Sequence, residues 1–181
     1  MAEEKKIGAI KEELQAAEDS MLPDFIARYE KDERSGVKSL VEKAGKRIQK
    51  LEAEYARIEN LKKYEKEYAD AGYICGIDEV GRGPLAGPVV AGAVILPKDC
   101  DILYINDSKK LSASMREKLY DEIMEKAVAT GIGMAGPGRI DEINILQATY
   151  EAMRQAITNL KVKPDILLND AVTIPGVDIL S

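Results

Sequence analysis

The amino-acid composition changes near residue 70, and this change constrains the fold more than any other feature of the chain. Residues 1–70 are rich in Lys, Glu and Ala, whereas residues 71–181 hold most of the glycines and prolines. The second part also alternates between apolar runs and polar turns, the pattern of a layered α/β structure. The sequence therefore predicts two domains, a charged helical N-terminal extension over residues 1–70 and an α/β domain over residues 71–181.

Helices are predicted throughout the N-terminal extension. Ile7, Ile10 and Leu14 recur at helical spacing, and Pro23 suits the first turn of a short second helix. A long charged helix follows from about Val37 to Tyr68, with apolar positions in alternating steps of three and four. These positions are Ile48, Leu51, Tyr55, Ile58 and Leu61. The pattern is typical of a helical hairpin or short coiled coil, and a helix-mediated protein contact is expected.

Strands and helices alternate in the second domain. The predicted strands are Tyr73–Asp78, Pro88–Leu96, Thr130–Ala135 and Asp165–Asp170. One helix, capped by Ser112 or Ser114, is predicted to end near Ala127. Another is predicted over about Asn144–Leu160, after a break at Gly136–Gly138. This alternation indicates an α/β fold.

Several functional classes are excluded by composition. The chain has no histidine, which excludes Ser–His and Cys–His catalysis. The net charge of −6 argues against a broad basic coat for nucleic acid, while leaving room for local cations.

Cys75 and Cys100 are expected to be small buried hydrophobes in a reducing compartment. No apolar run approaches the ~18 residues of a membrane span, and the N-terminus lacks a secretory signal. A cytoplasmic protein without membrane contact is expected.

Acidic residues end two of the predicted strands. Asp78 and Glu79 close the first strand and Asp170 closes the last. The two neighbouring acids can serve one site only if the strand ends or bulges there, because adjacent strand residues point to opposite faces. If the two strands are neighbours, all three carboxylates converge, and hard oxygen ligands favour Mg²⁺ or Mn²⁺. Such a cluster suits two-metal phosphodiester hydrolysis, whereas a solvated strand end is the alternative.

Two polar segments could bind a substrate. The turn Gly81-Arg82-Gly83 exposes backbone groups and a guanidinium, which suits a phosphate or a ribose 2′-hydroxyl. The loop Asn106–Leu111 contains Ser108 and Lys109, which could hold phosphates. Read alone, the first segment is more typical of a structural turn, and the second is more typical of a solvated loop before a helix.

These segments resemble the ribonuclease HII family in order and spacing. The matching segments are Gly76–Val94, Asn106–Ser112, Glu142–Thr149 and Leu167–Asp170. The resemblance implies a ribonuclease H-like mixed sheet with flanking helices, with Asp78, Glu79 and Asp170 as three of the family's four metal-binding carboxylates. It also implies that Gly81, Arg82 and Gly83 sense the ribonucleotide, and that Ser108 and Lys109 contact the nucleic-acid backbone.

The implied reaction is cleavage of RNA–DNA hybrids, and of duplex DNA on the 5′ side of an embedded ribonucleotide, leaving a 3′-hydroxyl and a 5′-phosphate. Residues 172–181 hold one acid, Asp178, which lies too close to Asp170 to take the fourth ligand's place. The catalytic domain is therefore expected to be truncated at its C-terminus. Two alternatives stay open, an inactive fragment that binds nucleic acid and a helical interaction module with a vestigial domain.

Overall fold

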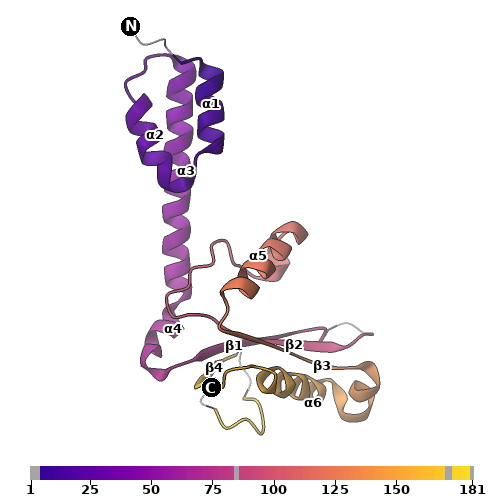
Figure 1. Ribbon diagram of the computed structural model, residues 1–181. Helices are drawn as coiled ribbons and strands as arrows, with labels where there is room; N and C mark the ends of the chain where they lie inside the picture. Colours follow the sequence, from indigo (N-terminus) through magenta and orange to yellow (C-terminus); the bar gives the residue numbers. More distant parts are fainter. Residues whose placement is uncertain (1–4, 84–85, 170–172, 180–181) are drawn as a thin grey trace. The chain divides into compact units, whose positions relative to one another are not determined.

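The computed structural model describes residues 5–83, 86–169 and 173–179. The chain divides into two compact units, Met1–Leu61 and Lys62–Ser181. Across the described ranges, no helix combines the length and the apolar character needed to cross a membrane. Figure 1 shows the helices of the first unit and the sheet of the second.

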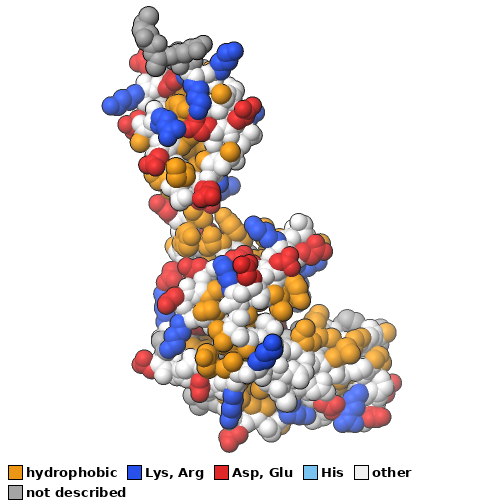
Figure 2. All heavy atoms as spheres, viewed as in Figure 1, with side chains coloured by type: hydrophobic (Ala, Val, Ile, Leu, Met, Phe, Trp, Pro, Cys, Tyr) orange, Lys and Arg blue, Asp and Glu red, His pale blue; other side chains and the backbone are white. Residues whose placement is uncertain are grey.

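Helices make up the first unit. They are α1 (Ile7–Ala16), the 3-10 turn η1 (Asp19–Met21), α2 (Leu22–Tyr29) and α3 (Ser35–Leu61). Pro23 lies in the first turn of α2, as predicted. The core of this unit comprises Ile10, Leu14, Leu22, Phe25, Tyr29, Val37, Leu40 and Ala44. On the face seen in Figure 2, its cations and anions are interspersed.

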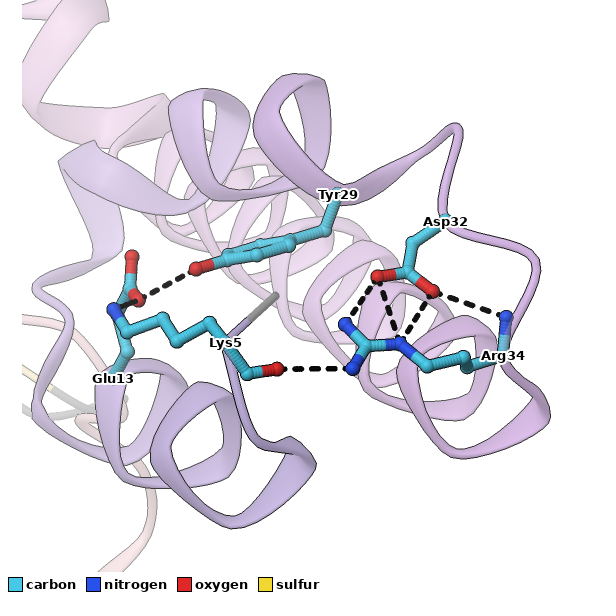
Figure 3. Close-up of polar contacts among 5 residues, drawn as sticks. All are labelled: Lys5, Glu13, Tyr29, Asp32 and Arg34. Atoms are coloured by element: carbon cyan, nitrogen blue, oxygen red, sulfur yellow. Dashed lines mark hydrogen bonds and ion pairs between the residues drawn. The ribbon is translucent and has the colours of Figure 1, made fainter. Parts of the chain in front are cut away.

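A polar network ties the start of the chain to α1 and α2 (Figure 3). The Glu13 carboxylate pairs with the Lys5 ammonium and accepts a hydrogen bond of 2.8 Å from the Tyr29 hydroxyl. Arg34 donates to the Asp32 carboxylate and, over 2.9 Å, to the Lys5 carbonyl. The network therefore joins residues before α1 to the turn between α2 and α3.

The stability of the first unit is expected to depend on the charge of Glu13. The hydrogen bond from Lys5, with help from Tyr29, lowers the pKa of the Glu13 carboxyl below its ordinary value of 4.5. A carboxyl with a lowered pKa stabilises the fold above its ordinary pKa, and this stabilisation is lost as the pH falls through the folded-state pKa. We expect hydrogen-exchange protection factors in α1 and α2 to fall as the pH is lowered below 4.5, and to change less in Glu13→Gln.

The adjacent exposed Glu12 provides the control for this experiment, because Glu12→Gln removes one carboxylate outside the network. It should leave the pH dependence intact. The same pH dependence in Glu13→Gln as in the unchanged chain would contradict the assignment.

The second unit contains a four-stranded mixed sheet in the order β3-β2-β1-β4. Its strands are β1 (Ile74–Val80), β2 (Val89–Ile95), β3 (Ala129–Ala135) and β4 (Ile166–Leu168). The pairs β1–β2 and β2–β3 are antiparallel, whereas β1 and β4 are parallel. The helices are α4 (Lys63–Glu67), η2 (Ala69–Ala71), η3 (Ser108–Lys110), α5 (Ala113–Lys126) and α6 (Pro137–Thr158).

Helix α6 covers one face of this sheet, and α5 lies on the other side (Figure 1). The covered face is formed by alternate strand residues, which are buried as period-two alternation requires. These residues and the helix positions against them include Cys75, Ile77, Val89, Ala91, Ala93, Ile95, Ala148, Ala152 and Ala156. On the other face, Val80, Ile132 and Met134 are exposed.

Two glycines of β3 let α6 approach the sheet with almost no side chain between them. A Cβ atom on Gly131 would lie 2.1 Å from the Ala156 carbonyl oxygen. One on Gly133 would lie 2.0 Å from the Ala152 carbonyl oxygen and 2.6 Å from the Ala156 nitrogen. Since real Cβ contacts are never this short, the helix and the strand are in direct backbone contact at these points.

Among the predicted boundaries that differ in the structure, three concern β1, α6 and the long helix. Strand β1 continues through Val80 instead of ending at Asp78, because Asp78 and Glu79 pair with Gly92 and Ala91 of β2. Helix α6 begins at Pro137, since proline suits a first helical turn. The long helix ends at Leu61 and a short helix follows it.

The predicted start of α6 at Asn144 is instead an interruption within it. Asn144 has a φ of 68° and a ψ of 163°, outside the helical region. Its side-chain oxygen accepts a hydrogen bond of 3.1 Å from the Gln147 nitrogen, as an N-cap does. Arg139, before the interruption, donates to the Glu151 carboxylate at 2.9 Å, after it. An ion pair therefore spans the break.

Candidate active site

Asp78 and Glu79 lie next to each other on β1 and point to opposite faces. Asp78 is exposed on the face that α6 leaves open, and its carboxylate accepts a hydrogen bond of 2.8 Å from the Glu79 nitrogen. Its partner on β2 is Gly92, and a Cβ atom built on Gly92 would meet nothing within 4 Å. The carboxylate of Asp78 therefore has open space beside it on the sheet.

Glu79 reaches the same end of the strand by a different route. Its side chain is 18% exposed and forms an ion pair of 3.3 Å with Arg82, which follows the strand. This contact brings the Glu79 carboxylate to the turn after β1. The strand neither ends nor bulges at Asp78 and Glu79, so the condition for both carboxylates to leave β1 on one face is not met. What they share is their place near the carboxyl end of the strand.

The two glycines that flank Arg82 differ in what the backbone requires of them. Gly81 has a φ of 90°, and a Cβ there would lie 2.3 Å from the Pro88 carbonyl oxygen. Glycine is therefore needed at Gly81 to form the turn. Gly83 has neither constraint, because a Cβ there would meet nothing within 4 Å. The missing side chain of Gly83 leaves room for a ligand to approach the backbone.

Asp170 lies outside the described residues. The last described strand residue before it is Leu168, which pairs with Gly76 of β1. Among residues 5–83, 86–169 and 173–179, no group of three acidic, cysteine or histidine side chains could hold a metal ion. The described part of the predicted cluster thus consists of Asp78 and Glu79.

Ser108 and Lys109 lie in the short helical turn η3, a separate element from β1. The Asp107 carboxylate caps this turn by accepting a hydrogen bond of 2.9 Å from the Lys109 nitrogen. Ser108, Lys109 and Lys110 are all exposed. Helix α5 follows at once, capped by Ser112, whose hydroxyl accepts from the Met115 nitrogen at 3.2 Å. Of the two predicted caps, Ser112 is therefore the one used.

The sequence pattern missed the residues that bring β1 and β4 together. The Asp165 carboxylate accepts a hydrogen bond of 2.8 Å from the Tyr73 nitrogen, while the Tyr73 carbonyl accepts one from the Asp165 nitrogen. Gly72, with a φ of 86°, leaves space for this carboxylate, because a Cβ there would lie 2.3 Å from it. A glycine before the first strand was the only available signal.

Cys75 is confirmed as a buried hydrophobe beneath the site, whereas Cys100 is half-buried. Burial raises the pKa of the Cys75 thiol to about 11. At pH 8 only about one thiol in a thousand would then be the reactive thiolate. We expect iodoacetamide to modify Cys100 and spare Cys75 in the folded chain, as read by mass spectrometry, and to modify both in urea. Modification of Cys75 at the same rate as Cys100 in the folded chain would contradict its burial.

A mixed sheet with flanking helices and adjacent acids at the end of β1 is the arrangement that the resemblance to ribonuclease H-like proteins implied. The model of the ribonuclease HII N-terminal domain matches residues 6–69, and that of ribonuclease HII matches residues 75–178. The chain belongs to the ribonuclease HII family, whose members are endoribonucleases.

Known proteins resemble this chain over most of its length. Ribonuclease HII of Lachnoclostridium phytofermentans is 62% identical over 172 residues, which cover 95% of this chain and 68% of that protein. Ribonuclease HII of Enterococcus faecalis is 49% identical, with coverage of 96% and 68%. The crystal structure of ribonuclease H2 from Pyrococcus horikoshii is 29% identical, with a TM-score of 0.45 and coverage of 59% and 52%. The chain thus spans about two thirds of the first two proteins.

Proposed function

We propose that this chain carries the metal-binding strand of an endoribonuclease that cuts the RNA strand of RNA–DNA hybrids. It also nicks duplex DNA on the 5′ side of an embedded ribonucleotide, leaving a 3′-hydroxyl and a 5′-phosphate. The observation that carries this proposal is the exposed carboxylate of Asp78 near the end of β1, which has open space beside it on the sheet. The family to which the chain belongs supports the same reaction.

The proposed metal ligands are Asp78, Glu79 and Asp170, with Mg²⁺ or Mn²⁺ as the ion. Asp170 is included because Gly76 pairs with Leu168 in parallel strands. Asp78 lies two residues after Gly76, and Asp170 lies two residues after Leu168. All three ligands are hard oxygens, which these cations prefer over nitrogen and sulfur. When bound, such ions stabilise the negative charge that develops on the phosphate during hydrolysis.

The remaining proposed roles belong to substrate binding. In the described structure, Arg82 forms an ion pair with Glu79. When a metal cation binds Glu79 instead, the Arg82 guanidinium can bind a substrate phosphate. Gly81 shapes the turn, and Gly83 admits a ribose close to the backbone, where the 2′-hydroxyl can be read. Ser108 and Lys109 contact the nucleic-acid backbone from their exposed loop.

The test is cleavage of a DNA duplex that contains one ribonucleotide, compared with the same duplex made entirely of DNA. We expect one nick on the 5′ side of the ribonucleotide in Mg²⁺ or Mn²⁺, no cut in the all-DNA duplex, and no cut in EDTA. Equal cutting of the two duplexes would reject ribonucleotide recognition. Binding without any nick would favour an inactive fragment that binds nucleic acid.

A cytoplasmic location is proposed, because both cysteines are free thiols, as expected in a reducing compartment. A protein contact through residues 1–70 is proposed as well, since three packed helices with a mixed-charge surface suit an interaction module. A pull-down by the whole chain that is lost when residues 1–70 are exchanged for an unrelated helical segment would support the contact.

A further inference from the structure

We infer that Arg116 is a positioning residue, whose guanidinium fixes the loop Asn106–Leu111 so that Lys109 and Lys110 face a nucleic-acid backbone. This inference rests on the proposed function, because the lysines matter only if the loop binds phosphates. It adds a role for a residue of α5 that the sequence pattern did not single out. We refer to the segment Asn106–Leu111 as the lysine loop.

The lysine loop is held at its beginning by its own side chains and backbone. The Asn106 side chain accepts a hydrogen bond of 2.9 Å from the Asp107 nitrogen, and the Asp107 carboxylate accepts one of 2.9 Å from the Lys109 nitrogen. The Asp107 carbonyl accepts from the Lys110 nitrogen at 2.9 Å. These contacts form one tight turn, which is too short to be stable alone.

Arg116 holds the other end of the lysine loop. Its Nη1 donates to the Leu111 carbonyl at 2.7 Å and, more weakly, to the Ser108 carbonyl at 3.4 Å. The Ser108 carbonyl already accepts a hydrogen bond of 3.3 Å from the Leu111 nitrogen, whereas the Leu111 carbonyl follows the turn, where a nearby cation can satisfy it. Arg116 lies in the first turns of α5, which Ser112 caps. One guanidinium therefore fastens the turn to a helix of 14 residues.

The geometry leaves both lysines available. Within the described part of the chain, no hydrogen bond or ion pair involves the Lys109 or Lys110 ammonium, and both side chains are exposed. A backbone held in place reduces the conformational entropy that must be lost when the lysines bind phosphates. Without Arg116, the lysines would keep their charge, but the backbone that carries them would no longer be held in place.

The first test measures the loop itself and needs no ligand. In Arg116→Gln we expect hydrogen-exchange protection of the Lys110 and Leu111 amides to fall about tenfold, while β2 and α6 keep theirs. Lys118→Gln is the matched control, because it removes one exposed cation from the same helix without touching the lysine loop. Unchanged protection of both amides in Arg116→Gln would overturn the inference.

The second test is a double-mutant cycle that compares Arg116→Gln, Lys109→Gln and the double variant. The quantity measured is the affinity for an RNA–DNA hybrid, by fluorescence anisotropy in EDTA. Lys109→Gln should weaken binding several-fold and reduce the slope of log K against log salt by about one. In the Arg116→Gln background the same change should cost less than about twofold. Arg116→Lys should restore part of the affinity.

The outcomes separate the role of Arg116 from that of the lysine loop. Equal losses from Lys109→Gln in both backgrounds would overturn the role of Arg116 and leave the lysine loop as a binding element, with Arg116 as an independent phosphate contact. No effect of Lys109→Gln in the unchanged chain would overturn the loop assignment and the role of Arg116 with it. Neither result would bear on Asp78, whose role is tested by cleavage.

Discussion

Asp78→Asn is expected to abolish nicking at an embedded ribonucleotide, with a loss of about a thousandfold or more. The change removes one negative charge from the proposed metal site, and metal-assisted stabilisation contributes on the order of 4 kcal/mol to such a reaction. Asparagine keeps the size of the side chain and an oxygen that can accept the hydrogen bond of 2.8 Å from the Glu79 nitrogen. The measurement is single-turnover cleavage of the labelled duplex, with far-UV circular dichroism to show that the fold persists.

Asp99→Asn provides the matched control, because Asp99 is also exposed and lies in the turn after β2, whose last residue pairs with the start of β1 and not with the end that carries Asp78. It should nick at the rate of the unchanged chain. If Asp78→Asn retained nicking to within tenfold of that rate, Asp78 would not be a metal ligand, and the proposed site would have to be placed elsewhere.

Gly133→Ala is expected to have the largest effect on stability, a loss of about 3 kcal/mol in the free energy of unfolding. The added Cβ would lie 2.0 Å from the Ala152 carbonyl oxygen. Because the obstacle is backbone, α6 must move away from the sheet and open the core at Ala152 and Ala156, both fully buried. At a typical dependence on urea, the unfolding midpoint of the second unit would fall by roughly 1.5 M.

Gly92→Ala is the control for this substitution. Gly92 lies in the neighbouring strand of the same sheet but faces the open side, where a Cβ would meet nothing within 4 Å. Alanine should be neutral or slightly stabilising there, because glycine is entropically unfavourable in a strand. Equal losses in Gly133→Ala and Gly92→Ala would show that the effect comes from the glycine backbone rather than from contact with α6.

The local elements of this fold were largely predictable from the sequence. Apolar spacing predicted α1, Pro23 predicted α2, and the apolar runs predicted β2 and β3 to within one residue at each end. These features depend on nearby residues, so a single sequence contains them. The mixed sheet was implied only by the resemblance, and the order that places β1 between β2 and β4 was not predicted, because pairing between distant segments leaves no local pattern.

The errors in the prediction have a common origin in long-range contacts. Asp and Glu are poor strand formers, so the first strand was expected to end at Asp78, yet pairing with Gly92 and Ala91 extends it to Val80. Arg116 was not singled out for a similar reason. Its contacts with Leu111 and Ser108 are made by a side chain reaching backward, and charged residues near a helix start are usually solvated.

The contact between Gly133 and the backbone of α6 affects how the sheet can move. Side chains between a helix and a strand normally absorb small shifts by changing rotamer, and here those side chains are missing. A displacement of β3 would therefore be passed on to α6 without attenuation. Bending of α6 would instead be concentrated where the helix loses its regular geometry, at Asn144, a point that the Arg139–Glu151 ion pair spans.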